Sequence, residues 1–121
     1  MFAAHTLGAE GERIAVEYLR QKDYEILHTN CRIGREEIDI VARDHTDHML
    51  VFVEVKTRSR LSASYPVRTA LTRRKRAALR RAMFQWMERM HTDEAARIDL
   101  VVVSQNRVTE HLQDLGSEFL I

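Results

Sequence analysis

The sequence predicts an α/β sandwich in which helices flank a mixed central β-sheet, in the order αβββαββ. Two long segments repeat apolar residues at a helical period, and five shorter segments are continuously apolar or alternate between apolar and polar residues. The chain has 121 residues, 45% hydrophobic and 31% charged, which suits a single domain over residues 1–121.

The predicted helices span His5–Gln21 and Thr72–Met90. The first carries an apolar stripe on one side, formed by Leu7, Ala15, Tyr18 and Leu19. The buried face of the second follows a 4-3-4 spacing through Leu79, Met83, Trp86 and Met90. Each helix therefore has one face to pack on a sheet.

The predicted strands are Tyr24–Cys31, Glu37–Arg43, Met49–Lys56, Ile98–Ser104 and Val108–Leu112. Ile98–Ser104 is so apolar that we expect it inside the sheet, whereas the weaker Val108–Leu112 suits an edge. The polar stretch 44–48 predicts a hairpin between the second and third strands, and Ser59–Thr69, which contains Pro66, predicts a loop.

The hairpin brings acidic residues together. If Asp44 pairs with Met49, then Asp39 lies opposite Glu54, and Glu37 lies opposite Lys56. Side chains alternate between the two faces of a strand, so Glu37 and Asp39 share one face. Ile38, Ile40 and Ala42 are expected to point to the other face, into the core.

Two carboxylates that face each other destabilise a sheet, so something must offset their repulsion. A bound divalent cation would do so, and so would a shared proton. Mg²⁺ suits one or two carboxylates plus other oxygens, which predicts Asp39 and Glu54 as metal ligands, with the Val55 carbonyl as a third. Mn²⁺ fits the same ligands. Lys56, two residues after Glu54, would hold a phosphate or orient the attacking water. The alternative for Lys56 is an exposed salt bridge to Glu37.

Two further side chains could reach this site. Glu12 lies on or beside the buried face of the first helix, where it could contact the metal directly or support it, or could form a local ion pair. Lys75 continues the apolar stripe of the second helix toward the sheet, where it could touch a phosphate. Its alternative is to extend into solvent.

The net charge of +1 conceals an asymmetry between the two halves of the chain. Residues 1–55 contain eleven acids and six bases, whereas residues 58–81 contain nine bases and no acid. A basic block beside an acidic one suits a surface that binds a polyanion next to a cation site, and the alternative is a solvated helix face. The predicted nucleic-acid contacts are Arg58, Arg73, Lys75 and Arg76.

The segments Glu37–Ala42 and Val51–Arg58 resemble the YraN-like family of bacterial proteins, as do residues 8–15 and Arg97–Val101 more loosely. That family is described as a predicted endonuclease similar to archaeal Holliday-junction resolvases, within the PD-(D/E)xK, or restriction-endonuclease-like, superfamily. The resemblance implies that fold. It places the family's acidic pair on Asp39 and Glu54, its lysine on Lys56 and its helical glutamate on Glu12. Where the family has glycine before Glu-Ile-Asp, this chain has Glu36.

Together these patterns predict a Mg²⁺-dependent endonuclease that cuts DNA, with Glu12, Asp39, Glu54 and Lys56 as catalytic residues. Only the resemblance suggests branched DNA, and symmetric cutting of a junction would need a homodimer. The alternatives are a non-catalytic nucleic-acid-binding module on a nuclease fold, and an assembly protein with an acidic partner.

The sequence also bears on the compartment. Cys31 is the only cysteine, no apolar run reaches the length of a membrane span, and residues 1–12 lack the apolar core of a signal peptide. A reducing cytoplasm is therefore expected.

Overall fold

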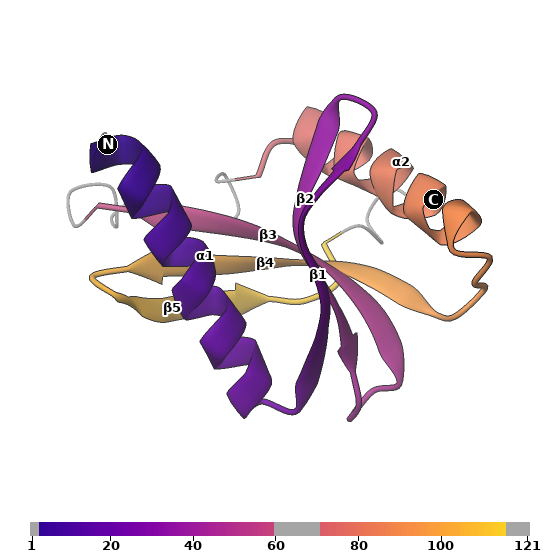
Figure 1. The fold of residues 1–121 in the computed structure, drawn as a ribbon, viewed down its shortest axis with the longest axis horizontal. Helices are drawn as coiled ribbons and strands as arrows, with labels where there is room; N and C mark the ends of the chain where they lie inside the picture. Colours follow the sequence, from indigo (N-terminus) through magenta and orange to yellow (C-terminus); the bar gives the residue numbers. More distant parts are fainter. Residues whose placement is uncertain (1–2, 60–70, 116–121) are drawn as a thin grey trace.

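A computed structural model describes residues 3–59 and 71–115, and Figure 1 shows how its elements are arranged. They follow the predicted order: α1 Ala3–Gln21, β1 Tyr24–Ile33, β2 Glu36–Asp44, β3 Met49–Arg58, α2 Arg73–Arg89, β4 Ala96–Ser104 and β5 Arg107–Leu112. The first helix begins two residues earlier than predicted, at Ala3. Most of the predicted loop, residues 60–69, lies outside the described residues.

The five strands form one mixed sheet in the order β1-β2-β3-β4-β5. Neighbouring strands are antiparallel except for β3 and β4, which are parallel. Eight consecutive residues of β4, Arg97–Ser104, are buried, and β5 lies at an edge, so both predictions for these strands are confirmed. The chain passes from β3 to β4 through α2, which is the crossover that a parallel pair requires.

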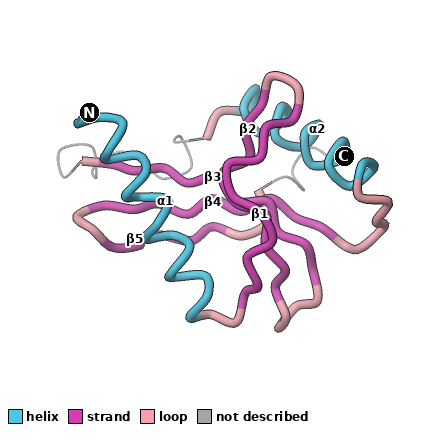
Figure 2. The backbone as a smooth tube through the Cα atoms, viewed as in Figure 1, coloured by secondary structure: helices cyan, strands magenta, loops and turns pink. Residues whose placement is uncertain are grey.

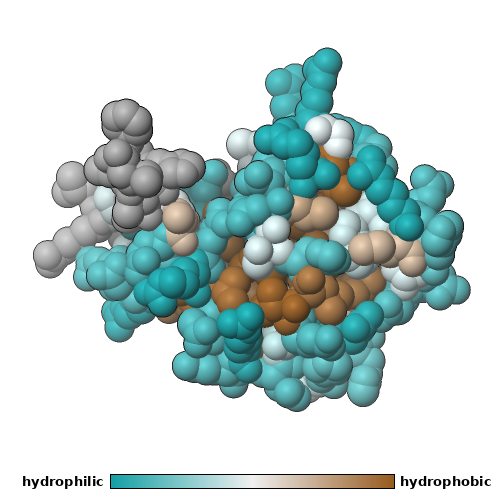
Figure 3. Space-filling view, in the orientation of Figure 1, coloured by the Kyte–Doolittle hydropathy of each residue, from teal (hydrophilic) through white to brown (hydrophobic). Residues whose placement is uncertain are grey.

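Each helix covers one face of the sheet, and Figure 2 shows the helices on separate sides of the strands. On one face, Ala15 and Leu19 of α1 pack in a cluster with Ile40, Val51 and Val53. On the other face, α2 packs on a cluster that includes Phe52, Ile98 and Leu100. In the space-filling view of Figure 3, apolar residues gather in the middle of the visible face, and hydrophilic residues surround them.

One predicted feature of β2 is wrong. Ile38 and Ile40 were expected to share a face, but Ile38 packs in the cluster against α2 and Ile40 in the cluster against α1. The strand therefore turns about its axis around Asp39. On the neighbouring strand β1, the register shifts between Ile26 and His28, and Asn30 has left-handed backbone with φ of 53°. Such irregularities increase local twist, which no alternation rule anticipates.

A buried ion network closes the opposite end of β2. The Arg97 guanidinium donates to Asp44 Oδ2 at 2.9 Å, to Asp99 Oδ1 at 3.0 Å and to the Tyr24 hydroxyl at 2.8 Å. The His111 ring lies 2.8 Å from Asp99 Oδ2. Buried charges of this kind are tolerated only when they are paired, so this network fixes β2, β4 and β5 relative to one another.

Candidate metal centre and phosphate-facing surface

The candidate centre lies where β2 separates from β3. Their ladder runs from Asp44 paired with Met49 to Ile40 paired with Val53, which is the predicted register. Just beyond the last pair, Asp39 Oδ2 accepts a hydrogen bond from the Val55 N–H at 2.8 Å. The carboxylate of Asp39 therefore takes the place of a backbone acceptor and lies between the two strands.

Asp39 and Glu54 are close together, although the ladder ends at Ile40 and Val53, one pair before the predicted pairing of these two residues. Their carboxyl groups are close enough for the charge of Asp39 to shift the pKa of Glu54, and Glu54 is only 8% exposed. Burial, followed by the charge of Asp39, raises the pKa of Glu54 to about 7. Burial also raises the pKa of Asp39, although the hydrogen bond from Val55 opposes it. Both shifts favour a protonated carboxyl in the pair while no cation is bound.

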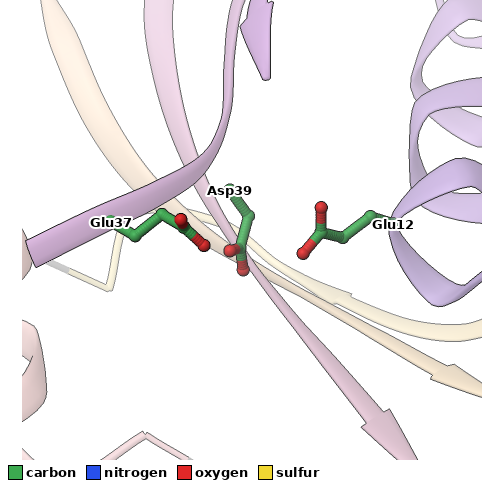
Figure 4. A group of neighbouring side chains, drawn as sticks. All are labelled: Glu12, Glu37 and Asp39. Carbon is green, nitrogen blue, oxygen red and sulfur yellow. The ribbon is translucent and has the colours of Figure 1, made fainter. Parts of the chain in front are cut away.

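Glu12 and Glu37 complete the acidic group. Oxygens of Glu12, Glu37 and Asp39 lie within 4.8 Å of one another, and Figure 4 shows the three carboxylates turned toward a common point from α1 and β2. Burial, then the charges of Asp39 and Glu37, raise the pKa of Glu12, while a hydrogen bond with Asn30 opposes the shift. Asp39 therefore lies between Glu37 and Glu12, and it is also next to Glu54.

Glu37 and Asn30 are the residues that sequence reasoning missed. Glu37 was considered only as an ion-pair partner of Lys56, but the β2–β3 ladder ends before these two residues could pair. Its position two residues before Asp39, on the same face of the strand, was the signal that could have identified it. Nothing in the sequence around Asn30 indicated that its side chain would interact with the Glu12 carboxyl.

A glycine lets Glu12 approach the sheet. Gly11 packs against β3 so closely that a β-carbon at this position would overlap the Thr57 hydroxyl oxygen. A side chain there would push α1 away from the sheet, together with the neighbouring Glu12. The close approach is thus part of what builds the acidic group.

Two lysines are near the pair, and they do not contribute equally. Lys75 Nζ lies 2.9 Å from Glu36 Oε1, and its charge lowers the pKa of both Asp39 and Glu54. Lys56 is exposed and lowers the pKa of Glu54 less than Lys75 does. The structure therefore brings Lys75, which was predicted as a phosphate contact, next to the acidic pair. Glu36, which stands where the family has glycine, is the residue that pairs with Lys75.

The predicted basic residues lie at two places. Arg73, Lys75 and Arg76 are in the first turn of α2, where Thr72 caps the helix by accepting from the Lys75 N–H at 3.1 Å. Cations at a helix N-terminus oppose the helix dipole, so this end of α2 favours a bound anion. Arg58 is the last residue of β3, on the same face of the strand as Glu54 and Lys56.

The family described as Uncharacterised protein family UPF0102 matches residues 11–103. The chain belongs to this family. UPF0102 is the YraN family, so the resemblance drawn from the sequence is confirmed. The match spans α1 from Gly11 through almost all of β4, and therefore includes every candidate metal ligand.

Relatives named as UPF0102 proteins match over most of their length. The protein from Beutenbergia cavernae is 42% identical over 122 residues, covering 96% of this chain and 100% of that protein. The protein from Christiangramia forsetii is 36% identical over 111 residues, covering 89% of this chain and 91% of that protein. The protein from Caldicellulosiruptor saccharolyticus is 40% identical, with 88% of each chain covered.

Among solved structures, one chain from "Structure of EndoMS-dsDNA2 complex" resembles this UPF0102 protein at 15% identity and a TM-score of 0.39. The likeness covers 80% of this chain and 38% of the other. Within residues 3–59 and 71–115, neither helix is long and apolar enough to cross a membrane.

Proposed function

We propose that this UPF0102 protein hydrolyses phosphodiester bonds of DNA with a divalent metal ion, Mg²⁺ or Mn²⁺, held by Asp39 and Glu54. The observation that carries the proposal is the placement of the buried Glu54 beside Asp39, next to which Glu12 and Glu37 add further negative charge. Such a concentration of acids is unfavourable alone, and a cation would relieve it.

The donor atoms suit a hard cation. Glu12, Glu37 and Asp39, whose oxygens lie within 4.8 Å of one another, and the neighbouring Glu54 offer only carboxylate oxygens, and the Val55 carbonyl is the backbone oxygen that could complete the set. When bound, the ion would supply positive charge to the phosphate oxygens and lower the pKa of a water molecule. The near-neutral pKa of Glu54 means that it can give up its proton to ligate a metal at physiological pH.

The lysines supply the remaining positive charge. Lys75 already lies near both members of the pair and can exchange its contact with Glu36 for a phosphate oxygen. Lys56 is on the same face of β3 as Glu54, from which it can stabilise charge that develops on the phosphate or hold the attacking water. For these roles the ammonium groups of Lys75 and Lys56 need to lie close to the metal ion, and they do not need to ligate it.

DNA is the proposed substrate because the cationic surface adjoins the acidic pair. The helix α2 carries seven bases and one acid in the sequence RRKRAALRRAMFQWMER, and four of the bases occupy its first turn. Contacts of this kind go to the sugar–phosphate backbone and position the nucleic acid without reading its bases.

The proposal is tested by incubating supercoiled plasmid and synthetic branched DNA with Mg²⁺ or Mn²⁺. Wild type should cut at least one substrate, whereas Asp39→Ala and Glu54→Ala should reduce the rate by a factor of about 100 or more. Glu88→Ala, which removes an exposed acid of α2, is the matched control and should cut normally. Cleavage that survives both substitutions rejects this site. DNA binding without cleavage under either metal supports a non-catalytic module instead.

A further inference from the structure

A hollow of about 260 Å³ lies beyond Lys56 at the end of β3. Two arginines line it, Arg58 from β3 and Arg107 from the start of β5, together with Ser104, Gln105 and Thr109. Arg107 is exposed and Arg58 is half-buried. The two guanidinium groups, the Ser104 hydroxyl and the Gln105 amide can donate hydrogen bonds to an oxyanion, whereas the Thr109 hydroxyl already donates to the Val102 carbonyl at 3.4 Å.

The hollow opens on the same face of the sheet as the acidic pair. The parallel register of β3 and β4 runs without a shift from Leu50 to Arg58, so Glu54, Lys56 and Arg58 point to one face. Lys56 pairs with Val102 and Arg58 with Ser104, and both partners also line the hollow. A strand of DNA that passes Glu54 and Lys56 along this face therefore reaches the hollow next.

We propose that this hollow is a phosphate-binding subsite, in which Arg58 and Arg107 hold a backbone phosphate of the DNA strand whose scissile phosphate lies at Asp39 and Glu54. The inference rests on the proposed function for the location of the scissile phosphate. A guanidinium group presents a planar fork that matches two phosphate oxygens. Among the described residues that line the hollow, the two arginines are basic and Glu110 is acidic.

The distance between Glu54 and Arg58 along β3 limits which phosphate of the strand Arg58 can contact. Arg58 is four residues beyond Glu54 on an unbroken strand, and at about 3.3 Å per residue this is a separation of about 13 Å. Each nucleotide of a duplex advances about 3.4 Å along the helix axis. Because the phosphates of one strand also wind around that axis, the straight distance between them exceeds this rise, and the subsite contacts a phosphate roughly two to four nucleotides from the bond that is cut. This assigns the protein a substrate that extends at least that far on one side.

The test measures binding of a labelled oligonucleotide duplex in EDTA, so that no hydrolysis is required. Arg107→Ala and Arg58→Ala should each weaken binding about tenfold, and each should reduce the slope of log affinity against log salt by about 0.9. The matched control is Arg20→Ala, which removes an exposed arginine in the last turn of α1 and should leave affinity within twofold. Thermal unfolding of each variant confirms that it is folded.

A position scan then locates the contact. Each phosphate of the duplex is replaced in turn by a neutral methylphosphonate. At one position the replacement should lower the affinity of wild type but leave the affinity of Arg107→Ala unchanged. That position should lie roughly two to four nucleotides from the bond cut when Mg²⁺ is added. Affinity that is unchanged in both arginine variants overturns the subsite even if Asp39-dependent cleavage is observed. Conversely, an arginine-dependent position in a protein that cuts nothing supports the subsite and rejects only the nuclease. Tight binding of inorganic phosphate alone, with DNA affinity unaffected by Arg107→Ala, would assign the hollow to a free anion and overturn the proposal.

Discussion

Replacement of Glu54 by glutamine should make the metal-free protein more stable at alkaline pH. The pKa of Glu54 rises from an ordinary 4.5 to about 7 in the folded protein, a difference worth about 3 kcal/mol. Because the folded state holds this proton more tightly, its contribution to stability is complete below pH 4.5 and is lost as pH rises through 7. Glutamine does not ionise, and its amide can still donate a hydrogen bond to Asp39.

The assay is urea unfolding in EDTA at pH 5 and pH 8. Glu54→Gln should exceed wild type by up to about 3 kcal/mol at pH 8 and by much less at pH 5, whereas the exposed control Glu88→Gln should match wild type at both. Added Mg²⁺ at 100 times its Kd should stabilise wild type by about 2.7 kcal/mol and the variant far less. Equal stabilities of Glu54→Gln and wild type at pH 8 would refute the claim that this carboxyl is held at an energetic cost.

Three further perturbations test other parts of the structure. Gly11→Ala should destabilise the protein by about 1–3 kcal/mol in urea because its methyl group overlaps β3, whereas Gly8→Ala, which meets nothing within 4 Å, should be neutral or stabilising. Arg97→Met leaves two buried aspartates without their cation and should cost about 3–5 kcal/mol, measured by thermal unfolding at pH 7. Lys75→Met should raise the pKa of the buried glutamate in the pair more than Lys56→Met does, as followed by carbon NMR titration; the reverse order would contradict the assignment of Lys75 to the site.

Most of the fold was predictable because its strands are either continuously apolar or end in recognisable turns. The hairpin is the clearest case: the polar residues 44–48 indicated its turn, and the turn set the register from Asp44 paired with Met49 to Ile40 paired with Val53, which brings Asp39 close to Glu54. The interior position of β4 followed from its run of apolar residues, and the edge position of β5 from its mixed composition. These inferences depend only on local pattern.

The parts that were not predictable depend on three-dimensional context. Period-2 alternation assigned Ile38 and Ile40 to one face, but β2 turns about its axis between them, next to the irregular region of β1. The acidic neighbours of Asp39 also differ from the predicted ones. The β2–β3 ladder ends before Glu37 could lie opposite Lys56, and Glu37 lies beside Asp39 and Glu12 instead. The relative importance of the lysines could not be judged either, because the position of α2 over the sheet is a tertiary property.

The separation of β2 from β3 explains why one carboxylate can serve both faces of the sheet. A side chain on a regular strand faces one side only, so residues of α1 and α2 would be separated by the full thickness of the sheet. Asp39 instead fills the gap between strands by binding the Val55 N–H, so that Glu54 and Lys75 approach it from the α2 face and Glu12 approaches from α1. Substituting alanine at Asp39 therefore removes more than a ligand. It also leaves a β3 donor without its acceptor, whereas Asp39→Asn retains an acceptor for Val55 and loses only the charge. Equal loss of metal affinity in both variants, with greater loss of stability in the alanine variant, would separate the two roles of this residue.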